Sequence, residues 1–175
     1  ANDTRKTLIT AGRNPIITTV SDRDSGYIIT KFTNKTSTGA NGSDQGFVDT
    51  DFPLFRLGDV YLMLAECQLR GATGVTASQA LGFVNSLRTR ANGQTIAAAD
   101  LTLDFILDER LRELHWEAHR RQDLIRFGKF TGGSYNWAWK GNGVNGVAIP
   151  AHFKLFPLPA ESVAANPNLT QNTGY

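Results

Sequence analysis

The sequence contains little of what marks several classes of protein. Only one of its 175 residues is a cysteine, so no disulfide can form within the chain. We expect this residue, Cys67, to pack as a small hydrophobic side chain inside a helix. No segment approaches the ~18 apolar residues of a membrane-spanning helix. The net charge is only +2 and the basic residues lie among acids, so the sequence predicts no nucleic-acid binding.

The composition that is present suits a folded domain. Hydrophobic residues make up 41% of the chain and charged residues 19%, and 175 residues can bury one real core. Within that single domain we expect an irregular region, residues 1–51, followed by a helical region, residues 52–175. Turn residues separate two β-prone runs in the first region, so we predict a β-hairpin of Pro15–Val20 and Tyr27–Phe32.

Helical periodicity predicts four helices after residue 51, and hence an all-α fold with little sheet. Gly71 ends the first, Thr76 caps the second and Asn92 with Gly93 ends it, and Thr102 caps the third. We expect the third helix to reach the arginines at 120 and 121, and a short fourth helix to span residues 122–127. The expected apolar faces are Leu57, Val60, Tyr61, Leu64 and Ala65, then Ala80, Leu81, Val84 and Leu87, then Leu103, Ile106, Leu107, Leu111 and Leu114.

The first two of these helices look like a tetratricopeptide pair. The matching positions are Leu54, Leu57, Gly58 and Tyr61 in the first helix and Ala80 and Val84 in the second. One such pair leaves an apolar face uncovered unless neighbouring pairs stack on it, and about three pairs are needed for stability. We therefore expect the chain to be a fragment of a longer protein.

Acids and bases are concentrated in residues 108–129. Spacings of three or four residues would let side chains pair along a helix, at Asp108–Arg112, Glu109–Arg112, Glu117–Arg121 and Asp123–Arg126. Exposed pairs contribute only ~0.3–0.5 kcal/mol each, so this density indicates a partly buried ion network with a structural role. We assign to that network Glu109, Arg110, Glu113, Glu117, Arg120, Asp123 and Arg126.

Three aromatic residues, Tyr135, Trp137 and Trp139, lie in a glycine- and asparagine-rich loop. Sugars are bound by stacking on aromatic rings while amides and charged groups take the hydroxyls, and Asn136, Lys140 and Asn142 stand beside these rings. The loop is therefore the candidate ligand-binding site, with Tyr135, Trp137, Trp139 and Asn136 as its residues. The alternative is that the same rings pack against neighbouring helices, because large aromatic side chains dominate core burial.

Other chemistries find weaker support. His115 and His119 have the spacing of a zinc pair, but Trp116 stands where a metalloprotease needs glutamate and no third ligand is evident. Asp22 and Asp24 begin a calcium-loop pattern that lacks its final glutamate. Two glutamates one turn apart among arginines would both stay ionised, so they cannot serve as a glycosidase pair. We predict no enzyme, no metal and no cofactor.

Two blocks of the sequence resemble the SusD/RagB family, the glycan-binding surface lipoproteins of Bacteroidetes. The first is residues 108–129; the second runs through Leu155–Pro159 and Asn166–Asn172 to Gly174 and Tyr175. The resemblance extends from about Gly26 to the last residue. One departure is Ala118, which stands where the family usually has glycine.

The resemblance implies a larger SusD-like α-helical fold, of which this chain is roughly the C-terminal third. The missing N-terminal part is expected to carry the lipid anchor that holds the protein on the outer-membrane surface. The implied function is non-catalytic capture of a glycan or other nutrient and its delivery to a SusC-like TonB-dependent transporter. The alternative is a helical-repeat scaffold that binds peptides or proteins.

Overall fold

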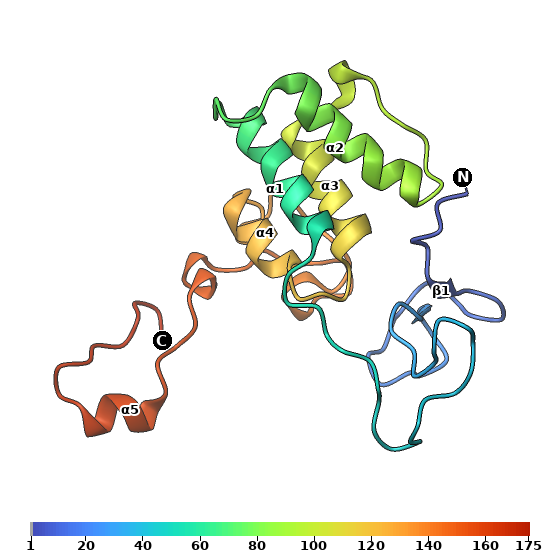
Figure 1. The fold of residues 1–175 in the computed structure, drawn as a ribbon. Coiled ribbons are helices and arrows are strands. Elements are labelled where there is room, and N and C mark those ends of the chain that lie inside the picture. Colours follow the sequence, from blue (N-terminus) through green and yellow to red (C-terminus); the bar gives the residue numbers. More distant parts are fainter. Residues whose placement is uncertain (1) are drawn as a thin grey trace. The chain divides into compact units, whose positions relative to one another are not determined.

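The computed structural model describes residues 2–175, and its regular structure is almost entirely helical, as expected (Figure 1). Two compact units divide the chain, Ala1–Arg120 and Arg121–Tyr175. The elements of the first are β1 (Leu8–Ile9), β2 (Ile28–Ile29), α1 (Leu57–Leu69), α2 (Ala77–Arg90), η1 (Ala98–Asp100) and α3 (Leu103–Leu114). Next come α4 (Arg120–Arg126), which begins at the unit boundary, η2 (Lys140–Asn142), η3 (Ala151–Lys154) and α5 (Ala160–Ala165).

Helices α1, α2 and α3 pack together to form the core of the first unit (Figure 1). Tyr61 of α1 and Phe83 of α2 stack with ring centroids 4.8 Å apart. Beside them Ala65 of α1 and Ala80 of α2 are completely buried, and alanine at both positions lets the two backbones approach closely. The tetratricopeptide-like helix pair predicted from the sequence is therefore present.

The predicted helix ends are confirmed where a local signal marks them. The Thr76 hydroxyl accepts a hydrogen bond from the Gln79 amide (3.2 Å) and the Gln79 side chain accepts one from the Thr76 amide (2.9 Å), which forms a capping box. Thr102 caps α3 by accepting from the Phe105 amide at 3.1 Å. Gly71 adopts the left-handed backbone, with φ of +94°, just after α1 ends.

The third helix is shorter than predicted, because α3 ends at Leu114 and α4 begins separately at Arg120. Between the two helices, Trp116 and Ala118 have φ angles of +61° and +62°. These angles are incompatible with a continuous right-handed helix. The expected burial of Leu111 is also wrong, since this side chain is 42% exposed. Paired charged side chains of α3 occupy the buried face in its place, as described below.

The predicted hairpin is wrong in one of its strands. β2 lies inside the expected run Tyr27–Phe32, but its antiparallel partner is β1, with Leu8 opposite Ile29 and Ile9 opposite Ile28. The run Pro15–Val20 forms no strand and is largely exposed. Proline has no amide hydrogen to donate to a neighbouring strand, which disfavours pairing at its start.

One face of α1 is apolar and uncovered. Leu57, Val60 and Met63 are 61%, 39% and 43% exposed, and Cys67 is exposed on the same side rather than packed as expected. The opposite side of α1, with Leu62 and Ala65, is fully buried, so the helix is apolar on both sides. Such a helix is normally enclosed by neighbours. Within residues 2–175 no helix combines the length and apolar content needed to cross a membrane.

We expect residues 1–175 on their own to self-associate through this face of α1, because contact between two copies would remove its apolar side chains from water. The double substitution Val60→Glu, Met63→Glu should shift the chain towards monomer, whereas Thr89→Glu, at an exposed position of α2, should not. Sedimentation velocity over a hundredfold range of concentration measures this. A concentration-independent monomer for the unchanged chain would contradict the prediction.

Candidate functional site

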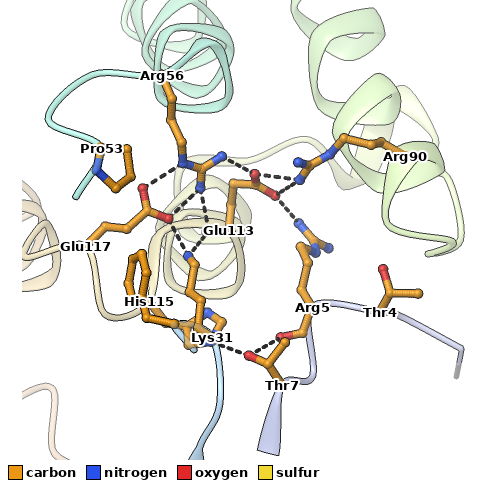
Figure 2. Close-up of a pocket in the computed structure, with 11 residues that line it drawn as sticks. Thr4, Arg5, Thr7, Lys31, Pro53, Arg56, Arg90, Glu113, His115 and Glu117 are labelled. Atoms are coloured by element: carbon orange, nitrogen blue, oxygen red, sulfur yellow. Dashed lines mark hydrogen bonds and ion pairs between the residues drawn. The ribbon is translucent and has the colours of Figure 1, made fainter. Parts of the chain in front are cut away.

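Three glutamates form the centre of a buried ion cluster in the first unit. Glu109 and Glu113 lie one turn apart on α3 and Glu117 lies in the turn that follows, with exposed fractions of 0%, 3% and 4%. A buried carboxylate is strongly unfavourable unless cations and hydrogen bonds replace the water it has lost. Figure 2 shows arginine and lysine side chains converging on Glu113 and Glu117.

Glu113 is the most heavily bonded of the three. Its Oε1 accepts from Arg56 Nη1 at 2.5 Å and from Arg90 Nη2 at 2.6 Å, and its Oε2 accepts from Arg5 Nη1 at 3.1 Å and from Arg90 Nη2 at 2.8 Å. Glu109 accepts from Arg5 at 2.7 Å. Its other partners, each at 2.8 Å, are Arg88 and Arg112.

Glu117 is held by two basic side chains from distant parts of the sequence. Arg56, just before α1, donates to both of its oxygens, from Nε at 2.6 Å and Nη2 at 2.8 Å, and Lys31 donates to Oε1. Arg56 and Lys31 also donate to the backbone carbonyl of Glu113, at 2.6 and 2.9 Å. That carbonyl belongs to the last turn of α3 and has no helical partner, so the two cations also satisfy the negative end of the helix.

The remaining residues assigned to the ion network also form ion pairs or hydrogen bonds. Arg110 pairs with Asp59 of α1 at 2.7 Å, and Arg120 Nη1 donates to the Leu107 carbonyl at 2.9 Å. Asp123 and Arg126 pair with each other at 2.8 Å in the second unit. The structure thus brings Glu109, Glu113 and Glu117 together, with Arg5 joining the first two and Arg56 the last two.

The pairing expected from helical spacing is only partly correct. Glu109–Arg112 and Asp123–Arg126 form, but the helix ends before Glu117 can use the i,i+4 geometry that a bond to Arg121 requires. The main partners of the cluster, Arg5, Lys31, Arg56, Arg88 and Arg90, were missed. They lie 21 to 108 residues away from their glutamates, a separation at which no sequence spacing reveals a contact.

The carboxylates of Glu113 and Glu117 are held in their ionised form. Burial alone would raise the pKa of Glu113, but bonds and charges from Arg56, Arg90 and Arg5 outweigh it and lower the pKa below its ordinary value. Burial would also raise the pKa of Glu117, but the hydrogen bonds and charges of Arg56 and Lys31 outweigh it and lower this pKa below its ordinary value. A hydrogen bond from Arg5 lowers the pKa of Asp3 to about 2. At neutral pH Glu113, Glu117 and Asp3 therefore carry their full negative charge.

A glycine at the start of α1 leaves space for one of these contacts. A Cβ atom added at Gly58, in the first turn of α1, would stand 2.5 Å from Arg56 Nη1 and 2.9 Å from Glu113 Oε1. The sequence pattern attributes the small residue here to helix–helix approach. In the structure it gives room to the Arg56–Glu113 ion pair.

A pocket of about 330 Å³ opens beside Glu113 and Glu117 (Figure 2). Its lining comprises Thr4, Arg5, Thr7, Lys31, Phe32, Pro53, Arg56, Arg90, Glu113, His115 and Glu117. The ring nitrogens of His115 are engaged, with Nε2 3.2 Å from the Thr7 hydroxyl and Nδ1 3.1 Å from the Arg112 carbonyl. Among residues 2–175 no three His, Cys, Asp or Glu side chains are grouped as a metal site would require.

The candidate aromatic loop lies in the second unit. Tyr135, Trp137 and Trp139 are each partly exposed, and the rings of Tyr135 and Trp137 are tilted by 54° with centroids 6.0 Å apart. The Asn136 side chain is exposed and donates to the Asn145 carbonyl at 2.8 Å. Trp139 has a φ of +67°, at the turn that leads into η2.

Lys140 supports this loop from inside. It is only 1% exposed, and its Nζ lies 4.8 Å from the Trp137 ring centroid. The same ammonium group donates to the carbonyls of Gly132 (2.7 Å) and Tyr135. The expectation that Lys140 stands beside the rings is right, but its bonds are to the loop backbone, so it positions the rings instead of offering a charge to a ligand.

The fold and the two sites define an all-α scaffold with tetratricopeptide-like helix pairs, a buried ion cluster and an aromatic loop. Comparison with known proteins gives the family. The model of the SusD family matches residues 7–175, so the chain belongs to the SusD family.

Three relatives show the extent of the similarity. The starch-binding protein SusD of Bacteroides thetaiotaomicron is 38% identical over 179 residues, which cover 100% of this chain and 31% of that protein. A SusD superfamily protein from Bacteroides vulgatus is 33% identical, with a TM-score of 0.60 over 77% of this chain and 30% of the other. Surface glycan-binding protein A from Bacteroides uniformis, 22% identical, shares the fold with a TM-score of 0.66 over 98% and 38%. The chain thus spans about a third of the length of these relatives.

The turn between α3 and α4 is strained, which leads to a stability prediction. Ala118 adopts a φ of +62°, a conformation that costs an L-residue roughly 1–2 kcal/mol and glycine nothing. After allowing for the greater freedom of glycine in the unfolded chain, we expect Ala118→Gly to raise the free energy of unfolding by about 0.5–1 kcal/mol. Urea denaturation measures the gain. Ala77→Gly, at the ordinary backbone of the first turn of α2, serves as the control and should give none.

The lowered pKa values of Glu113 and Glu117 predict acid sensitivity. A group whose pKa is lower in the folded state adds stability that is complete above its unfolded value, near 4.5, and is lost as the pH falls through the folded value. We therefore expect the free energy of unfolding to decrease as the pH is lowered below about 4.5.

The Glu113→Gln variant tests the origin of that loss. Removing the Glu113 charge leaves the largely buried guanidinium groups of Arg5 and Arg56 less compensated, so it should cost about 3 kcal/mol at pH 7 and make the acid decline shallower. Glu161→Gln, at an exposed position of α5, is the matched control. An unchanged pH profile in Glu113→Gln would show that the cluster does not set the acid sensitivity.

Proposed function

We propose that the chain is part of a non-catalytic protein that binds oligosaccharides at the outer-membrane surface and passes them to a TonB-dependent transporter. Membership of the SusD family supports this, as does the name of the relative that matches the whole chain, a starch-binding protein. Because the chain spans 31% of that relative, the proposal concerns the longer protein of which this chain would form a part.

The observation that carries the proposal is the aromatic loop. The partly exposed rings of Tyr135 and Trp137 lie 6.0 Å apart at a fixed tilt, and a buried lysine beneath them bonds to the loop backbone. Rings held in place before binding lose little conformational freedom when a ligand stacks on them. The exposed amide of Asn136 lies between them in sequence and has a remaining acceptor oxygen for a sugar hydroxyl.

The ion cluster supports a binding role over hydrolysis. Glycoside hydrolysis requires one carboxyl group to be protonated near neutral pH so that it can act as an acid. At Glu113 and Glu117 the surrounding cations lower the pKa, so neither can hold a proton there at neutral pH. We assign both glutamates a structural role and propose that bound glycans are released intact.

The proposed partners follow from the family and from the open face of α1. A SusC-like outer-membrane transporter would receive the glycan, and a lipid anchor outside this chain would hold the protein at the cell surface. The remainder of the longer protein would supply the helical layer that covers Leu57, Val60 and Met63.

Titration calorimetry with a starch heptasaccharide tests the binding site. We expect Trp137→Ala to weaken binding about tenfold, because loss of one stacking ring removes roughly 1.4 kcal/mol. Trp116→Ala, which removes an exposed tryptophan of the first unit, should leave the affinity unchanged. Equal affinities of the unchanged chain, Trp137→Ala and Trp116→Ala would exclude the loop as the site. Release of reducing ends during the titration would contradict the non-catalytic role.

A further inference from the structure

We propose that the pocket beside Glu113 and Glu117 binds a sugar unit that carries a carboxylate or sulfate group. This inference rests on the proposed glycan-binding function and adds a second subsite, which selects acidic glycans. It follows from the charge balance of the ion cluster, from the bonding of its acids and from the lining of the pocket (Figure 2).

The ion cluster has more cations than anions. Its carboxylates are Asp3, Glu109, Glu113 and Glu117, and the basic side chains bonded to them are Arg5, Lys31, Arg56, Arg88, Arg90 and Arg112. These six basic side chains and four carboxylates give a surplus of two positive charges. Four of the six cations and only two of the four anions line the pocket, so the surplus lies at its wall.

The acids in the pocket have little capacity left for a ligand's donors, since only Glu117 Oε2 accepts a single hydrogen bond. Each carboxylate oxygen of Glu113 accepts two hydrogen bonds, and Glu117 accepts three from Arg56 and Lys31. A ligand that supplies acceptors therefore suits this pocket better than one that supplies donors. An anionic group does so and also neutralises part of the surplus charge.

Arg90 is the side chain best placed to meet such a group. It is 57% exposed, and within residues 2–175 it bonds through Nη2 alone, to Glu113. Its Nε and Nη1 donors therefore remain for a ligand, while the bond to Glu113 holds the guanidinium in place. An arginine fixed in this way recognises a planar carboxylate or a sulfate through paired hydrogen bonds.

The rest of the lining suits a sugar ring. Phe32 and Pro53 provide apolar faces to the lining, which also includes Thr4 and Thr7. Aromatic and apolar rings contact the C–H face of a sugar. The Thr4 hydroxyl donates to the Ala91 carbonyl at 3.2 Å, so its oxygen can accept from a sugar hydroxyl. A volume of about 330 Å³ is at the lower end of the range for ligand sites and admits a single unit, not a longer chain.

Titration calorimetry of the full chain with glucuronate, glucose 6-sulfate and neutral methyl glucoside tests the proposal. We expect one or both acidic sugars to bind with a Kd of roughly 1 mM, more weakly as salt is added, and the neutral sugar not to bind measurably. Arg90→Gln should weaken the acidic sugar at least fivefold. The matched control Arg23→Gln, at an exposed position outside the pocket, should not change it.

Binding of glucuronate alone, or of the sulfate ester alone, identifies the acidic group and supports the proposal. Absence of binding by both, or equal affinity in Arg90→Gln and the unchanged protein, overturns it. A parallel titration with the neutral starch heptasaccharide separates the two hypotheses. If only the neutral oligosaccharide binds, the acidic subsite is wrong and the proposed function stands; if nothing binds, both fail.

Discussion

The first unit depends on the ion pairs and hydrogen bonds of the Arg56 guanidinium group. This group joins Glu113 at the end of α3 to Glu117 in the following turn, from a position just before α1, and also caps the helix carbonyl of Glu113. The buried carboxylates would be strongly unfavourable without it, so the start of α1, the end of α3 and the strained turn are fixed together. Arg5 and Lys31 extend the same constraint to the irregular N-terminal segment.

Local signals in the sequence predicted the helices well. Thr76 and Thr102 act as caps because their hydroxyls replace missing helical acceptors, and Gly71 ends α1 because it adopts a positive φ easily. The break after Leu114 could not be predicted in this way. Trp116 and Ala118 have no intrinsic preference for positive φ, and the ion pairs of Glu117 with distant residues hold the turn in that form.

The same distinction separates what was predictable about the two sites. Residue type alone indicated that the aromatic loop has the chemistry of a sugar site. The expectation of a larger helical fold around it came from the family resemblance. The burial of Lys140 beneath Trp137 could not be read from the sequence, because lysine is usually exposed and only the converging loop carbonyls make this position favourable. Among the partners of the ion cluster, Arg112 alone had a helical spacing that pointed to its glutamate.

In the first unit the charges of the ion cluster are paired, whereas the apolar face of α1 is uncovered. The acids of the ion cluster have their partners within the first unit, in Arg5, Lys31 and Arg56. The unmet requirement is apolar. Leu57 and Met63 project from a helix whose other side is already buried, so a further helical layer would stabilise the unit through α1 and leave the charges as they are.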